Sequence, residues 1–141
     1  MNAAARPDLT LEAFERGAVD ASTFDHEAHV YIGWLYLLQY PLLEAIRRYC
    51  TALQQLTRQL GVPDKYHETI TWFFLIQIDE RRRSGNGSDW FEFRRQNTDL
   101  FEAGSLLARY YSPERLSAAA AKHRFLLPDR LAEPVALRTG P

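Results

Sequence analysis

The sequence predicts an all-α fold, a compact single-domain bundle of about six or seven helices over residues 1–141. Apolar side chains recur with the 3.6-residue period of a helix in several stretches, and none shows the alternation typical of a half-buried strand. Most of the seven prolines and seven glycines fall between these stretches, where they separate one helix from the next. With 46% apolar residues, a chain of this length can bury one core without disulfides.

The first part of the chain is expected to hold two helices. A short helix covers residues 10–16 and ends at Gly17, a residue suited to the left-handed turn after a helix. Asp25 is a typical N-cap for a second helix from residue 26 to about 40. Pro41 ends that helix and suits the first position of the next one.

The third helix, which ends at Gly61, has the clearest periodicity. Charged side chains such as Glu44 and Arg47 fall off its apolar stripe, so one face is expected to pack on the core. The stripe is formed by Leu42, Leu43, Ile46, Tyr49, Cys50, Leu53, Leu56 and Leu60.

The fourth helix is predicted from about Tyr66 to Arg83. Its middle, residues 70–76, is apolar almost all round, which together with its length favours a buried central helix over a strand. A glycine- and serine-rich loop at residues 84–88 follows it.

Three short helices are expected after this loop. The first is capped by Ser88 or Asp89 and ends at Arg95, and Thr98 caps the second. The last helix starts at Ser112 and continues through residues 118–121. Residues 1–8 and 131–141 are expected to be extended or loosely held tails.

Charge and composition predict a cytoplasmic protein that binds neither nucleic acid nor membranes. Seventeen basic and 18 acidic residues give a net charge of −1, so no overall field attracts polyanions. The longest apolar run, residues 72–76, is far below the roughly 20 residues of a membrane span. Residues 1–7 lack the apolar core of a signal peptide, and the single cysteine, Cys50, excludes an internal disulfide. Cys50 lies on an apolar stripe, which favours inert core packing.

Three of the four histidines fall in two aromatic-rich segments that open long helices. His26 and His29 are three residues apart, about 60° around a helix, so both can face one space. Gly33 continues their stripe and leaves room beneath them, for close helix packing or for a cavity floor, although a helical glycine costs about 1 kcal/mol. In the second segment, His67 shares a helix face with Thr71.

These positions predict a metal site made by His26, His29 and His67, provided that the two helix starts lie side by side. Three imidazoles with an open fourth position suit a catalytic divalent transition metal, and the sequence does not distinguish Zn, Fe, Cu or Ni. Glu27 or Glu68 would be a fourth ligand, an orienting residue or a general base. Two alternatives stay open, a metal-free acid/base or ligand pocket and purely structural histidines.

Further residues are candidates for catalysis and substrate binding. Glu68 and Tyr66 are the expected proton-transfer groups, since both flank His67. Four other side chains are expected to contact a substrate, although aromatic residues at helical spacing more often fill a core and Arg124 more often meets solvent. These four are Trp34, Tyr36, Thr71 and Arg124.

Several enzyme classes lack their motifs in this sequence. The HEAH segment at residues 26–29 is one residue too short for the zinc-protease motif HExxH, and the paired Glu-x-x-His motifs of di-iron bundles do not occur. A dinucleotide-binding GxGxxG, a P-loop and a GxSxG nucleophile elbow are also missing.

Three segments carry a resemblance to known proteins: FxHxxHV at residues 24–30 with WxYL at 34–37, KYHETIT at 65–71, and Arg124-Phe125 before Pro128-Asp129. They resemble a family of small, uncharacterised bacterial all-helical proteins. The resemblance covers roughly residues 20–130, and KYHETIT is its most specific part. The resemblance implies that the two histidine segments belong together, and it implies no reaction, cofactor or substrate.

Three functions remain on the sequence alone. We expect first a small metal-dependent enzyme that acts on a small organic substrate between the second and fourth helices, by lyase or isomerase, hydrolase or oxygen-using chemistry. The second is a metal-free acid/base enzyme or small-ligand binder that uses the same histidines. The third is a structural or interaction module, with a homodimer through an aromatic helix face left open.

Overall fold

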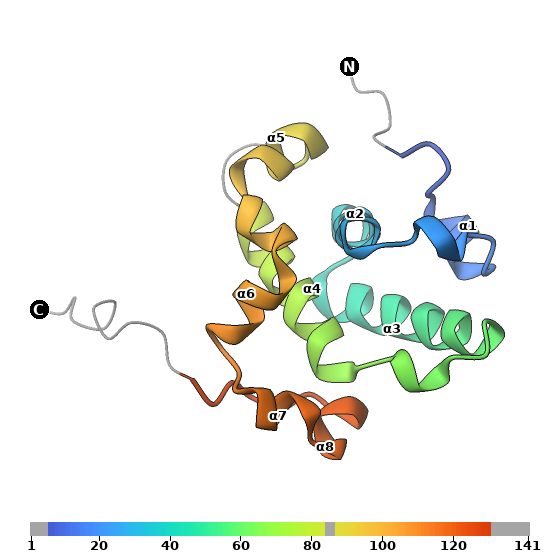
Figure 1. Ribbon diagram of the computed structural model, residues 1–141. Helices are drawn as coiled ribbons and strands as arrows, with labels where there is room; N and C mark the ends of the chain where they lie inside the picture. The colour runs from blue at the N-terminus through green and yellow to red at the C-terminus, as the bar shows by residue number, and fades with distance from the viewer. Residues whose placement is uncertain (1–5, 84–86, 131–141) are drawn as a thin grey trace, which may run out of the picture.

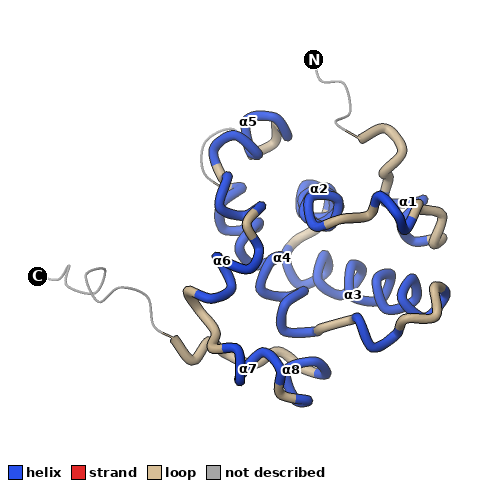
Figure 2. The backbone as a smooth tube through the Cα atoms, viewed as in Figure 1, coloured by secondary structure: helices blue, strands red, loops and turns tan. Residues whose placement is uncertain are grey.

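A computed structural model describes residues 6–83 and 87–130, and this part of the chain is all-α, with eight α-helices, three short 3-10 turns and no strand. The fold class is confirmed (Figures 1 and 2). The structure has more helices than the expected six or seven for two reasons. The last predicted helix is divided into two, and a short helix that was not predicted follows the third 3-10 turn. The helices are α1 (Leu11–Glu15), α2 (His26–Gln39), α3 (Leu42–Gln59), α4 (Glu68–Arg82), α5 (Trp90–Gln96), α6 (Ala103–Ala108), α7 (Pro113–Ser117) and α8 (Ala119–His123).

The three long helices pack on one another and form the core. α4 is central, because it contacts α2, α3 and α8, and its most extensive contact is with α2. Figure 1 shows α5 at one end of the molecule and the α7–α8 pair at the other. In the described chain no helix has the length and apolar character that crossing a membrane requires.

Side-chain caps start several helices where the sequence indicates them. Asp25 accepts from the backbone N–H of Ala28 and Thr10 accepts from Ala13, each at 3.0 Å. Gly17 has a φ of 71°, the left-handed conformation that ends the first helix and that favours glycine. Local hydrogen bonding therefore determines these boundaries.

The α3 stripe is buried along most of its length, with two exceptions. Ile46, Tyr49, Leu53 and Leu56 are buried in the core together with Cys50. Leu43 and Leu60, at the two ends of the stripe, are 76% and 45% exposed. Leu42 is partly buried against the core, so periodicity alone overestimates the buried face at Leu43 and Leu60.

Three expected boundaries differ in the structure. α4 begins at Glu68 because His67 occupies its N-cap position and accepts from the N–H of Ile70. Thr98 opens a 3-10 turn, Thr98–Phe101, without a side-chain cap. The last predicted helix is divided at Ala118, whose ψ of 142° is extended.

The segment after the division at Ala118 is held on α4. α8 packs on α4, and the buried Thr69 hydroxyl lies 2.8 Å from the carbonyl oxygens of both Ala121 and Arg124. The expected tail at 131–141 and most of the 84–88 loop lie outside the described residues.

Candidate functional site

The three clustered histidines separate into two environments. His26 and His29 on α2 both line a cavity between α2, α4 and α6. His67 stands at the start of α4 and does not line this cavity. The two helix segments therefore meet, but only two of the three imidazoles face the same space.

His26 is held by a hydrogen bond from the first turn of α2 to a distant segment. Its Nε2 lies 2.8 Å from the carbonyl oxygen of Leu100. A carbonyl only accepts hydrogen bonds, so Nε2 carries the hydrogen, and in the neutral ring Nδ1 keeps a lone pair. The ring packs edge-on against Phe74, with 4.8 Å between ring centroids. Within the described chain nothing donates to Nδ1.

His29 is held through its opposite ring nitrogen. Nδ1 lies 2.8 Å from the carbonyl oxygen of Asp25, which assigns the hydrogen to Nδ1 and leaves the lone pair on Nε2. Burial of the imidazole lowers the pKa of His29 below its ordinary value of 6.5, and nearby His26 lowers it further, against the opposing effect of the Asp25 hydrogen bond. His29 is therefore a neutral hydrogen-bond acceptor at pH 7.

The cavity, which we name the inner cavity, has a volume of about 290 Å³. Its two other polar side chains are already engaged: Thr71 donates to the carbonyl of His67 at 2.8 Å, and Tyr49 donates to that of His29 at 3.1 Å. Among the polar side chains of the lining, only the second ring nitrogens of His26 and His29 have no hydrogen-bond partner within the described residues. The lining consists of His26, His29, Val30, Tyr49, Ile70, Thr71, Phe74, Leu75, Ile78, Ala103 and Leu107.

His67 has a structural role in which both ring nitrogens take part. Nδ1 accepts from the N–H of Ile70 at 3.2 Å, and Nε2 donates to the carbonyl of Leu116 at 2.7 Å. The ring thus caps α4 and ties it to α7. His67 could act as the third metal ligand only if one of these two hydrogen bonds were broken.

The three-histidine metal site fits this arrangement poorly. Among residues 6–83 and 87–130, no group of three or more His, Cys, Asp or Glu side chains is placed to hold a metal ion. Glu27 is engaged by Arg94, whose Nη2 lies 3.0 Å from the carboxylate. The metal centre made by the three histidines therefore stays a prediction.

Tyr66 and Glu68 form a pair outside the inner cavity. The Tyr66 hydroxyl donates to the Glu68 carboxylate, and both residues line a polar cavity of about 350 Å³ together with Lys122. Burial raises the pKa of Tyr66 well above its usual range, with contributions from Cys50 and Glu68. Burial also raises the pKa of Cys50 to about 11, which keeps it a thiol and agrees with a packing role.

Three of the four expected substrate contacts lie elsewhere. Trp34 packs on Trp90, and its indole N–H donates to the carbonyl of Gly87 at 2.7 Å. Tyr36 is fully buried, and its hydroxyl donates to Glu15 at 2.8 Å. Burial raises the pKa of Tyr36, and the hydrogen bond to Glu15 raises it further. The side chain of Arg124 is exposed at the end of α8. Only Thr71 lines the inner cavity.

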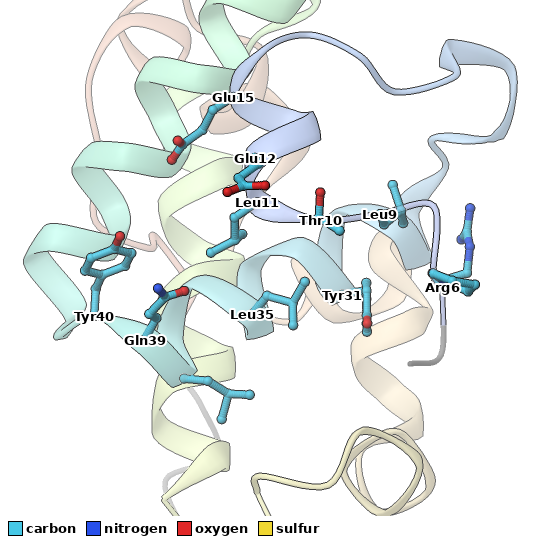
Figure 3. Close-up of a pocket in the computed structure, with 12 residues that line it drawn as sticks. Arg6, Leu9, Thr10, Leu11, Glu12, Glu15, Tyr31, Leu35, Gln39 and Tyr40 are labelled. Atoms are coloured by element: carbon cyan, nitrogen blue, oxygen red, sulfur yellow. The ribbon is translucent and has the colours of Figure 1, made fainter. Parts of the chain in front are cut away.

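A larger cavity of about 660 Å³ lies between the N-terminal segment and α2 (Figure 3). Side chains of residues 6–15 face Tyr31, Leu35 and Gln39 of α2 across it. Glu15 at its edge already accepts from Tyr36, and this cavity contains no histidine.

Sequence reasoning missed the contributions of α3 and α6 to the inner cavity. Tyr49, Ala103 and Leu107 reach it through tertiary packing, and nothing in their local sequence marks them as lining residues. Comparison with protein-family models, curated proteins and solved structures finds no significant match to the chain.

Proposed function

We propose that the protein binds a small, mostly apolar organic molecule with a hydrogen-bond donor in the inner cavity, without a metal ion. The observation that supports this is a mostly apolar cavity lined by two histidines, each of which in its neutral state keeps a lone pair without a partner, on Nδ1 of His26 and on Nε2 of His29. A volume of about 290 Å³ suits a small ligand, since ligand cavities begin at about 300 Å³.

Acid/base chemistry on such a ligand is the extension of this proposal. Because its pKa lies below 6.5, His29 is unprotonated at pH 7 and can accept a proton from an acidic O–H, N–H or C–H. Its Nδ1–H bond to Asp25 fixes the tautomer and orients the ring, which is the arrangement a general base needs. Tyr66 and Glu68 take no part, since they face a different cavity.

Phenol and toluene, two probes of nearly equal size, test the proposal. Phenol can donate to an imidazole lone pair and toluene cannot, so calorimetry should show phenol binding about fivefold more tightly, as expected for one net hydrogen bond. His26→Gln keeps a donor where Nε2 stood, and His29→Asn keeps one where Nδ1 stood, while each removes the lone pair that faces the ligand. The preference for phenol should fall in each variant and vanish in the double variant.

His123→Gln is the matched control, because His123 is exposed on α8. This variant should keep the full preference for phenol. Equal affinity for phenol and toluene in the natural protein, or an unchanged preference in the double variant, would contradict the proposal. A stoichiometric transition metal in untagged protein that both cavity variants lose would contradict the metal-free proposal and support the metal-dependent alternative.

A further inference from the structure

His29 is also a wall of a second cavity, which we name the outer cavity. This cavity has a volume of about 540 Å³ and lies between the Ala21–Thr23 turn, the C-terminal half of α3 and residues 62–66. Among residues 6–83 and 87–130, His29 alone lines both the inner and the outer cavity. Its ring packs on Phe24, which also lines the outer cavity, with 4.3 Å between ring centroids.

The lining of the outer cavity is mostly apolar, and the hydroxyl of Thr57, one of its polar side chains, donates to the carbonyl of Gln54. Leu56 is buried and Leu60 is half-exposed, and both contribute aliphatic surface. Lys65 is the only side chain of the lining that carries a full charge at neutral pH, and no carboxylate lines the cavity. The Tyr66 hydroxyl is engaged by Glu68.

Lys65 is available to an anionic ligand. Its side chain is exposed and forms no ion pair with any residue in the described part of the chain. A cation at the edge of an apolar cavity matches a molecule with one anionic group and an apolar chain, because the ammonium attracts the charge and the walls bury the chain.

We propose that the outer cavity binds an aliphatic monocarboxylate, with its carboxylate at Lys65 and its chain between Leu56, Leu60 and Phe24. The chain then ends against the His29 ring. Binding in the outer cavity does not depend on the function proposed for the inner cavity.

Octanoate and 1-octanol test this proposal by calorimetry, because they share a chain and differ in charge. Octanoate should bind about fivefold more weakly to Lys65→Gln than to the natural protein, while octanol should be unaffected. Affinity should rise about fourfold per methylene from hexanoate to octanoate, as expected for a chain that leaves water.

A second variant pair tests the location independently of Lys65. Leu60→Glu places a like charge at the outer cavity and should weaken octanoate binding further. Leu43→Glu is the matched control, since Leu43 is also exposed but lies at the other end of α3, about 25 Å away. Neither position is buried, so both variants are expected to fold.

The outcomes separate this proposal from the one on the inner cavity. Unchanged octanoate affinity in both Lys65→Gln and Leu60→Glu, or no saturable octanoate binding to the natural protein, overturns the outer-cavity proposal. Octanoate binding that depends on Lys65, in a protein that does not distinguish phenol from toluene, supports it and contradicts the proposed function.

Discussion

His26 and His29 stand one turn apart on α2 and donate from opposite ring nitrogens, Nε2 of His26 to the carbonyl of Leu100 and Nδ1 of His29 to that of Asp25. Each hydrogen bond fixes the tautomer of the neutral ring, in which the other nitrogen keeps the lone pair. Both residues line the same cavity, so the proposed function uses these two lone pairs as hydrogen-bond acceptors.

Replacing His67 should cost stability in proportion to the hydrogen bonds lost. His67→Ala removes the cap on Ile70 and the donor to Leu116, so the free energy of unfolding should fall by about 2 kcal/mol. His67→Asn keeps a capping oxygen and should lose about 1 kcal/mol. Urea denaturation measures both values, and equal losses in the two variants would contradict the capping role.

Stability should depend on pH through His29. Its pKa in the folded protein is lowered below 6.5 by burial, so at lower pH the unfolded chain binds more protons than the folded one. The contribution of His29 is therefore complete above about pH 6.5 and is lost as the pH falls through 6.5 toward the lowered value. Urea denaturation measures the free energy of unfolding between pH 8 and pH 5. This free energy should decline less steeply toward low pH in His29→Asn than in the natural protein, and the same pH dependence in both would refute the prediction.

Gly33 should influence the inner cavity more than the stability. A Cβ at this position would lie 3.0 Å from Leu75 Cδ2 and 3.2 Å from Ile78 Cδ1, and both side chains line the cavity. In Gly33→Ala they must move, and this cost offsets a helix-propensity gain of about 1 kcal/mol. We expect little change in stability and weaker phenol binding.

Gly104→Ala is the control for this substitution, because a Cβ there meets no atom within 4 Å. It should stabilise α6 by up to about 1 kcal/mol and leave phenol affinity unchanged. Phenol binding that is equal in the two alanine variants would show that Gly33 does not shape the cavity.

The Thr69 hydroxyl should anchor the segment after α8. It lies 2.8 Å from the carbonyls of Ala121 and Arg124 and accepts from the N–H of Leu126 at 3.1 Å. Thr69→Val keeps the shape but leaves these buried groups unpaired, at a cost of about 2 kcal/mol. Hydrogen exchange should show the Leu126 amide losing protection.

Thr71→Val provides the comparison, because the carbonyl of His67 that Thr71 contacts also accepts from the Thr71 backbone N–H. Its removal orphans no group, and the loss should stay below about 1 kcal/mol. A Thr69→Val variant that is no less stable than Thr71→Val would refute the anchoring role.

Local signals predicted the fold well where one side chain determines a boundary. Asp25 caps α2 as its position indicates, and the period of α3 identifies its buried face at Ile46 and Leu53. The break at Ala118 was not predictable, because alanine favours helix and the run of alanines at 118–121 carries no local signal for an extended residue.

The candidate site was predictable only in part. Helical spacing brings His26 and His29 together, and the same spacing places Thr71 and Phe74 on one face of α4. His67 does not join them, since a helix start one or two residues later than expected changes it from a helical position to the N-cap. The α6 residues depend on packing between segments far apart in sequence, which periodicity does not encode.

Long-range ¹H–¹⁵N NMR of the histidine rings at pH 8 tests the central claim most directly, because it reports which nitrogen carries the hydrogen. We predict a neutral Nδ1–H tautomer for His29 and Nε2–H tautomers for His26 and His67. Added phenol should shift the ¹⁵N signals of His29 Nε2 and His26 Nδ1 and leave His67 unchanged. An Nε2–H tautomer at His29, or ring signals that do not respond to phenol, would contradict the account.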